Sequence, residues 1–186
     1  MIIALIVLAL IALFVMFTYN RLVSLRQAWK RAFADVDVQL KQRQDLVPNL
    51  VETVKGYATH ESTVFTQVTE ARASAMKANT VGEKSAAEGA LTGALGNLMA
   101  VAENYPQLKA NENFLKLQNR ISELEERIAD RREFFNDDVT TYNTRIGQIP
   151  DVFVASFLSL KPRPMFKVSD EDRKQIEVKF QSQGAL

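Results

Sequence analysis

The sequence contains no cysteine and only one histidine among 186 residues. Without cysteine there is no disulfide bond, thiolate nucleophile or thiolate metal ligand, and one histidine leaves little for a metal centre or a catalytic triad. A strong net charge is also missing, because 23 Lys and Arg residues oppose 22 Asp and Glu, so no overall field favours nucleic acid. We therefore expect no catalytic residue, no metal, no cofactor and no nucleic-acid partner.

The single histidine lacks the neighbours that zinc chemistry needs. His60 is followed by Glu61, but a zinc-protease helix places a second His four residues away, and those positions hold Gly56 and Val64. A surface or capping histidine is the simpler interpretation. The enzymatic alternative, a hydrolase or protease subunit, predicts that activity is lost when His60 or a single carboxylate is replaced.

Charged residues are absent before Arg21, and residues 1–19 are almost entirely aliphatic or aromatic. As a helix this segment is about 28 Å long, close to the hydrocarbon thickness of a bilayer. A signal peptide would carry a basic start and a small-residue cleavage site, and a buried core helix would carry a polar stripe. Neither feature occurs, so 1–19 is predicted to be a transmembrane anchor. Its membrane residues are Ile2, Leu5, Leu8, Ile11, Phe14 and Phe17, with Tyr19 at the edge.

Basic residues follow the apolar run closely. They are Arg21, Arg26, Lys30 and Arg31, whereas the first acidic residue is Asp35. By the positive-inside rule, the side of the membrane that holds these basic residues is the cytoplasm. We therefore predict a single-pass protein with its N-terminus outside and the remaining chain in the cytoplasm.

Apolar or small residues recur every three or four positions through the rest of the chain, which is typical of amphipathic helices. The pattern predicts an all-α fold, in which the transmembrane helix is followed by an antiparallel up-and-down four-helix bundle over residues 20–160. The predicted helices are 20–44, 48–78, 83–103 and 108–147. A polar C-terminal tail, 161–186, completes the chain, with an extended start and a helix over 170–180.

Proline and glycine mark the expected breaks between these helices. Asp45 and Pro48 predict a turn after the first helix, because proline removes a hydrogen-bond donor and disfavours helix at the preceding residue. The alternative is that Pro48 only kinks one long helix, which leaves three helices. Pro106 separates the last two helices, and Gly147 and Pro150 end the fourth.

An apolar cluster over residues 149–160 follows the last long helix. If four helices alternate in direction, this cluster returns to the membrane side. Phe153 and Phe157 would then enter the headgroups or contact a partner, with Lys161 and Arg163 beside anionic lipid. The alternative is that the cluster folds back as a cap on the bundle core. With three helices it points away from the membrane.

Two polar groups are candidates for specific recognition. Asp37, Arg43 and Asp45 crowd the expected end of the first helix, and Tyr105 and Asn111 crowd the turn before the fourth. Alternating helices place both groups at the membrane-distal end. There they form either a partner surface or a network that caps the helices.

The third predicted helix contains Gly89, Gly93 and Gly96. Each interior glycine costs a helix about 1 kcal/mol relative to alanine. The glycines either allow a close approach, including that of another copy of the chain, or make a thin helix that fills a crowded bundle. The second interpretation is the simpler.

Several motifs resemble the bacterial LemA family. The longest, 32–61, reads AFADVDVQLKQRQDLVPNLVETVKGYATHE; the others are VTEAR at 68–72, ENYPQLKANEN at 103–113 and YNT at 142–144, and the apolar segment followed by Tyr19-Asn20 also fits. The resemblance extends to about Phe166. It implies an N-terminal anchor with an outside N-terminus and a cytoplasmic up-and-down four-helix domain. It implies no established enzymatic activity and offers no catalytic residue to carry over.

The function expected from these features is that of a membrane-anchored helical scaffold or adaptor without catalytic activity. It is expected at the cytoplasmic face of the bacterial inner membrane, assembled with itself through the anchor or through apolar stripes. Its expected partners are the lipid bilayer, further copies of the chain, and a membrane or cytoplasmic protein that the sequence does not identify. The alternative is a membrane-remodelling or coat-like oligomer that shapes the bilayer.

Overall fold

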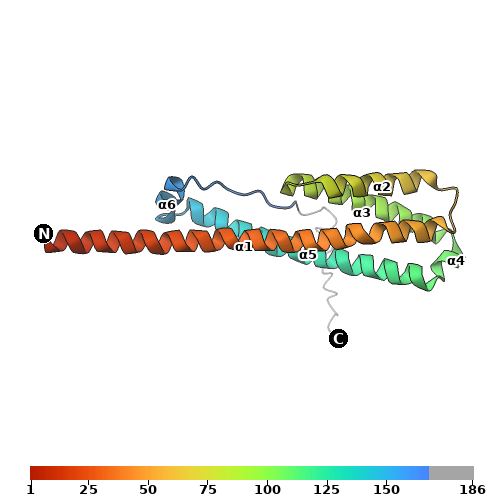
Figure 1. Cartoon of the computed structure of the whole chain (residues 1–186), viewed down its shortest axis with the longest axis horizontal. Coiled ribbons are helices and arrows are strands. Elements are labelled where there is room, and N and C mark those ends of the chain that lie inside the picture. Colours follow the sequence, from red (N-terminus) through yellow and green to blue (C-terminus); the bar gives the residue numbers. More distant parts are fainter. Residues whose placement is uncertain (168–186) are drawn as a thin grey trace, which may run out of the picture.

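Helices form all the regular structure in the described part of the chain. The computed structural model describes residues 1–167, and these contain no strand. The elements are α1 (Ile2–Lys55), α2 (Ser62–Lys77), α3 (Val81–Glu103), the single turn α4 (Pro106–Lys109), α5 (Glu112–Gly147) and α6 (Asp151–Phe157) (Figure 1). The prediction of an all-α fold is confirmed for these residues. The helix predicted over 170–180 lies outside them.

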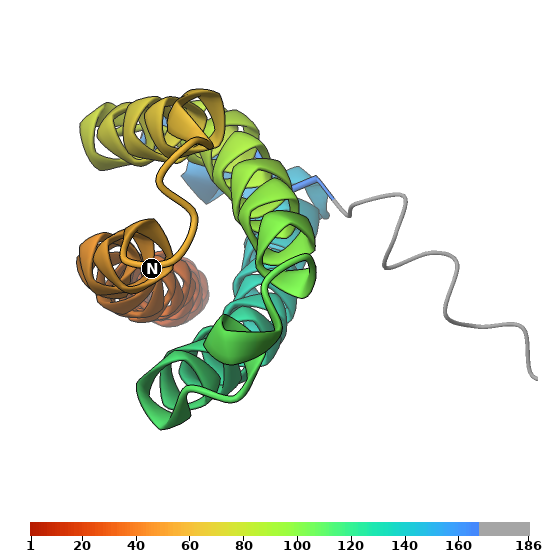
Figure 2. The ribbon, with the colours of Figure 1, turned by 90° about the vertical axis from the view of Figure 1, so that its right-hand side faces the viewer.

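Two long helices, α1 and α5, form an antiparallel pair that runs through most of the molecule (Figure 1). The α2–α3 hairpin covers the part of this pair that is farthest from the N-terminus, which we call the distal half. The other part carries α6, and we call it the proximal half. Seen end-on, α2, α3 and α5 curve around α1 (Figure 2). Chain direction therefore alternates along α1, α2, α3 and α5, but these four helices lie together only in the distal half.

Pro48 lies inside α1 and does not end the helix. A proline has no N–H, so the Gln44 carbonyl oxygen loses its helical donor. Arg72 of α2 replaces that donor, since its Nε donates to the Gln44 oxygen at 2.7 Å. The predicted turn at 45–48 is therefore wrong. The helix continues because a neighbouring helix satisfies the carbonyl that the proline leaves free.

The first reversal of the chain occurs at residues 56–61 instead. The N–H groups of Tyr57 and Ala58 both donate to the Val54 carbonyl, at 3.0 and 2.9 Å, and the buried Ala58 holds the turn against the core. The first predicted helix thus extends to the end of α1, and the predicted helix 48–78 is reduced to α2. The alternative in which Pro48 only kinks one long helix and three helices remain does not hold either. The chain still reverses its direction at residues 56–61, between α1 and α2.

Side-chain caps set where α3 and α5 begin. The Glu83 carboxylate accepts the N–H groups of Asn79 at 3.0 Å and Thr80 at 3.1 Å, and the Thr80 hydroxyl accepts the Glu83 N–H at 3.2 Å. This is a capping box, and the backbone donors of Asn79 and Thr80 lower the pKa of Glu83 below its ordinary value of 4.5. Asn111 caps α5, where its side chain accepts two N–H groups of the first turn.

The two halves bury different side chains between α1 and α5. The distal core is mainly aliphatic and draws on α1, α2, α3, α5 and the single turn α4, with members such as Leu50 and Leu98. The proximal half contains a cluster of aromatic rings. Phe135 of α5 lies between Phe33 of α1 and Phe166 near the C-terminus, with ring centroids 5.7 and 5.2 Å away. A third cluster joins α1, α5 and α6, so the long helix pair is held by three separate cores.

Residues 160–167 form an extended segment, the strap, that runs back from α6 along α5 (Figure 1). Two amide side chains of α5 hold its backbone, each donating to the carbonyl and accepting the N–H of one strap residue. Asn143 binds Arg163 in this way at 2.9 and 2.8 Å, and Asn136 binds Phe166 at 3.1 and 2.9 Å. The prolines on either side of Arg163 keep the strap extended. The predicted polar tail thus begins inside the fold, since Phe166 is buried.

The glycines of α3 face open space. A Cβ atom on Gly89, Gly93 or Gly96 would meet no neighbouring atom within 4 Å. The expectation of a thin helix in a crowded bundle is therefore wrong, because the crowded face of α3 is formed by other residues, such as Leu91 and Leu98.

Candidate membrane interface

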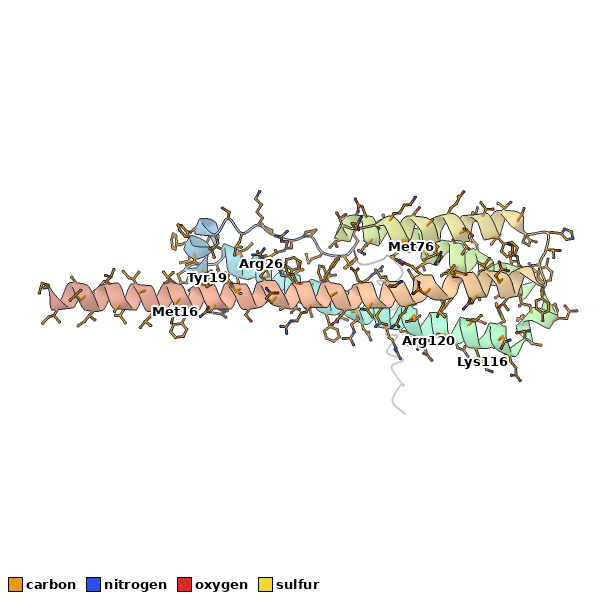
Figure 3. The ribbon with its side chains drawn as sticks, in the orientation of Figure 1. Met16, Tyr19, Arg26, Met76, Lys116 and Arg120 are labelled. Carbon is orange, nitrogen blue, oxygen red and sulfur yellow. The ribbon has the colours of Figure 1, made fainter. Side chains whose placement is uncertain are left out.

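The N-terminal part of α1 projects from the folded domain without neighbours (Figure 3). Among the described residues, α1 is the one helix with a stretch long and apolar enough to cross a membrane. Its side chains are exposed from Ile2 to Phe17, with Leu8 64% and Phe17 67% exposed. The predicted anchor residues all lie on this stretch, with Tyr19 just after it. A bare apolar helix of this length is suited to the hydrocarbon of a bilayer rather than to water.

α6 lies against α1 where the apolar segment ends. Thr18 is only 5% exposed although Phe17 and Tyr19 on either side of it are exposed. Met16 and Tyr19 stand at the level of α6 in Figure 3. One turn further along α1, the buried Leu22 packs in one cluster with Val154 and other residues of α6. The short helix is therefore fixed beside the end of the apolar segment of α1.

The two faces of α6 have different surroundings. Val154 and Ala155 are buried against Tyr142 and Ile146 of α5 and against α1. Phe153, on the opposite side, is 69% exposed, and Phe157 is 89% exposed. The alternative in which the 149–160 cluster folds back as a cap holds for one face of α6, and entry into the headgroups or contact with a partner stays a prediction. One face of α6 caps the proximal core and the other carries bare aromatic rings.

Basic side chains surround this end of the domain. Arg21 and Arg26 are exposed on α1 just beyond the apolar segment, and Lys161 and Arg163 are exposed on the strap. The Arg163 guanidinium lies 5.2 Å from the centre of the Trp29 ring, a cation–π contact that ties the strap to α1. The same end of the molecule therefore presents apolar rings and positive charge together.

The predicted partner surface is not assembled in one place. Asp37, Arg43 and Asp45 lie in the middle of α1, whereas Tyr105 and Asn111 lie beside α4 at the distal tip. Because α1 continues past Pro48, about 15 Å of helix separates Asp45 from that tip. The expectation that both groups share the distal end is wrong. Most of these residues have partners within the chain: Asp37 with Lys84 (2.9 Å), Asp45 with Lys41 (3.2 Å), Asn111 with the Tyr57 hydroxyl (3.0 Å), and Tyr105 with the distal core.

Arg43 belongs to a buried charged network that links three helices. It is 2% exposed and pairs with Glu88 of α3, which is 1% exposed. Gln44 donates to the other Glu88 oxygen at 2.6 Å, and Arg43 also reaches Thr92 at 2.9 Å and Glu125 of α5 at 3.2 Å. Buried charges are tolerated when each is paired and hydrogen-bonded in this way. Arg43 therefore holds the distal core together and is closed to an outside partner.

Comparison with protein families agrees with the motifs of the sequence. The sequence model of the LemA family matches residues 32–180. The chain belongs to the LemA family. The match begins within α1, beyond the apolar segment, and covers α2 to α6 and the strap of this LemA-family chain. A comparison with curated proteins found no match.

Glu88 is the network residue that the sequence analysis missed. It is the only charged residue between Lys84 and Glu103, in a stretch made otherwise of small, apolar and uncharged polar residues. A charged side chain on the buried face of a helix requires a partner. The lone charge was therefore a usable signal, although spacing alone does not identify Arg43 as its partner.

His60 is exposed in the turn between α1 and α2, the surface position expected for it. Within residues 1–167, no group of three or more His, Asp or Glu side chains is placed to hold a metal ion. The candidate site of this LemA-family chain is therefore the end of the domain where α6 packs against α1.

Proposed function

We propose that this LemA-family chain is a membrane-anchored helical scaffold or adaptor without catalytic activity. It would sit at the cytoplasmic face of the bacterial inner membrane and assemble with itself. The observation that carries the proposal is the course of α1. One unbroken helix, Ile2–Lys55, begins as a bare apolar segment and ends in the distal core.

A continuous helix couples the anchor to the domain mechanically. A 54-residue helix is about 80 Å long, and no loop or linker separates its membrane segment from its core segment. The domain therefore projects from the membrane at an angle that the anchor sets. Such rigidity suits a scaffold that holds partners at a defined distance from the bilayer.

The distal half is proposed as the four-helix unit of this scaffold. Its polar interior is used for internal contacts, since Arg43 and Gln44 bind Glu88, and this supports a structural rather than a catalytic role. The exposed Arg21, Arg26 and Lys30 next to the anchor support a cytoplasmic domain with the N-terminus outside.

A coat-like oligomer that shapes the bilayer is the second candidate. The bare rings of Phe153 and Phe157 at the membrane end favour it, because aromatic side chains at the lipid surface are typical of membrane-remodelling proteins that wedge into one leaflet. The two candidates differ in the effect of the assembled protein on lipid vesicles, so measurements on one sample of the full-length protein distinguish them.

The test measures the mass of the full-length protein in mild detergent by light scattering, and its effect on vesicles by electron microscopy. A uniform oligomer that leaves vesicles round supports the scaffold, and an ordered array that tubulates them supports the coat. A monomer at every concentration contradicts self-assembly in both candidates.

The orientation of the chain is tested separately. Since the chain has no cysteine, the variants Ile3→Cys and Ser62→Cys report orientation when intact cells are labelled with an impermeant maleimide. Labelling of Ser62→Cys instead of Ile3→Cys would overturn the proposed topology.

A further inference from the structure

The exposed face of α6 is too apolar for a surface that meets only water. Phe153 and Phe157 stand one turn apart on the same side of the helix, and Ile149 just before it is 79% exposed. These side chains form an apolar patch, whereas the exposed Phe134 of α5 has the Arg131 guanidinium 5.8 Å from the centre of its ring. A patch of this kind marks a contact surface.

The position of α6 identifies what the patch contacts. The helix packs beside Thr18 and Leu22, at the end of the apolar segment of α1, and Figure 3 places it level with Met16 and Tyr19. Once residues 1–19 cross a bilayer, this level is the boundary between acyl chains and headgroups. A helix about 10 Å wide that is fixed there lies in the same boundary.

The charges around α6 fit the same environment. Lys161 and Arg163 follow the helix on the strap, and Arg21 and Arg26 lie on α1 beside it, all exposed. The nearest acidic residue in sequence, Asp151, is buried and points toward Arg145 at 3.8 Å. Apolar rings flanked by basic residues are the composition of helices that lie in the plane of an anionic membrane surface.

We propose that α6 is a second membrane contact, lying in the plane of the leaflet from which the domain emerges. Phe153 and Phe157 insert between the headgroups, and Lys161, which follows α6 on the strap, binds the phosphates of anionic lipids. This inference rests on the proposed anchor and goes beyond it. A single helix leaves the domain free to rotate about its own axis, whereas two attachments fix which side of the domain faces the membrane.

The bilayer is favoured over a second copy of the chain as the occupant of this patch. The patch lies level with Met16 and Tyr19, where the exposed apolar segment of α1 ends. The basic residues beside it would repel their own copies in a symmetric dimer but attract anionic lipid. Occupation by another copy is an outcome that the experiment below detects.

The experiment uses the full-length protein in vesicles that contain phosphatidylglycerol. Three variants each carry one nitroxide label on the only cysteine: Leu8→Cys in the anchor, Ser156→Cys on the exposed side of α6, and Ser62→Cys at the distal end. Accessibility to oxygen, which concentrates in lipid, is compared with accessibility to a water-soluble nickel chelate. The expected result is a lipid environment at 8 and 156 and water at 62.

The other outcomes separate the inference from the proposed anchor. A lipid environment for the label at residue 8 together with a water environment at residue 156 overturns the second contact and leaves the anchor. A water environment for the label at residue 8 overturns the proposed function and the inference with it. Protection of 156 from both reagents overturns the inference in favour of a second copy on α6.

A matched pair of substitutions tests which side chains carry the contact. Replacing both Phe153 and Phe157 with Ser is expected to move the label at 156 from lipid into water, whereas Phe134→Ser, which removes an exposed ring on α5, leaves it in lipid. Circular dichroism checks that the helices persist in each variant. An unchanged lipid signal at 156 in the double variant overturns the assigned role of the rings.

The lipid composition tests the basic residues. Omitting phosphatidylglycerol is expected to reduce the lipid signal of the label at 156 but not that of the label at 8. An equal signal at 156 with and without phosphatidylglycerol would overturn the role of the basic residues.

Discussion

The distal and proximal halves hold the same two helices, α1 and α5, in different ways. In the distal half the α2–α3 hairpin closes an aliphatic core and Arg43 and Glu88 pair inside it. In the proximal half a strap without regular structure lies on the pair, held by two asparagine side chains and a cluster of rings. The stability of the distal half depends on leaving no unpaired charge in its interior, and that of the proximal half depends on side-chain hydrogen bonds to the backbone of an extended segment. The predictions below separate these two dependences.

The largest effect is expected from Glu88→Leu. It leaves the buried Arg43 without its closest partner, which costs about 3 kcal/mol of unfolding free energy, measured by chemical denaturation in mild detergent. Replacing the pair together, with Arg43→Met and Glu88→Leu, is expected to restore stability to within about 1 kcal/mol, because no buried charge remains. A double variant as unstable as the single one would contradict a cost due to the stranded charge.

Arg72→Met is expected to destabilise the distal half by about 2 kcal/mol, because the Gln44 carbonyl then loses the donor that replaces the missing N–H of Pro48. In a Pro48→Ala background the same change is expected to cost less, since the new N–H of residue 48 serves that carbonyl. A double-mutant cycle measures this coupling. An equal cost of Arg72→Met in both backgrounds would show that Arg72 does not compensate for the proline.

Asn136→Ala is expected to loosen the strap locally by about 2 kcal/mol, since two backbone hydrogen bonds to Phe166 are lost. Hydrogen exchange at the Phe166 amide should accelerate, while amides of α2 and α3 keep their rates. Asn119→Ala, at an exposed site of the same helix, is the control and should change neither. Faster exchange throughout the distal half would show that the two halves unfold as one unit.

Gly93→Ala is expected to raise the stability of the distal half by about 1 kcal/mol, because the new methyl group meets open space and alanine favours helix. Thermal unfolding of the full chain measures the change. The mass of the detergent-extracted protein is recorded beside it. A loss of stability together with a smaller oligomer would indicate that another copy packs closely on this face of α3.

The smallest effect on stability is expected from replacing Glu83 in the cap of α3. The pKa of Glu83 is lowered in the folded state, so its contribution to stability is present above the ordinary value of 4.5 and is lost as pH falls through the lowered pKa. The difference in melting temperature between the wild type and Glu83→Gln should therefore shrink on acidification. Glu126→Gln, an exposed change on α5, is the control. A difference that stays constant from pH 7 to pH 3 would contradict the role of the charge.

Local composition was sufficient for the features that depend on near neighbours in the chain. The anchor is predicted from an unbroken apolar run, the break between α3 and α5 from Pro106, and the extended strap from two prolines around Arg163. The direction of the chain then placed Phe153 and Phe157 at the N-terminal end of the domain, where the structure has them. Each of these depends on propensity or on simple alternation of helices.

The misplaced turn shows where such reasoning fails. Pro48 breaks a helix in isolation, and only a donor from another helix reverses that preference. The shift of the turn then separated Asp37, Arg43 and Asp45 from Tyr105 and Asn111, so the predicted partner surface failed for the same reason. One long-range hydrogen bond thus changed both the helix boundary and the candidate site.

The sequence by itself determined that this LemA-family chain is helical and that its first segment is suited to a membrane, because both properties are sums over neighbouring residues. Only the tertiary structure decided that α1 runs unbroken into the core, that Glu88 meets Arg43, and that Phe166 returns to α5. These outcomes depend on single contacts between residues 28 to 45 positions apart. A contact of that kind has no signature in local composition, since its energy exists only when both partners are in place.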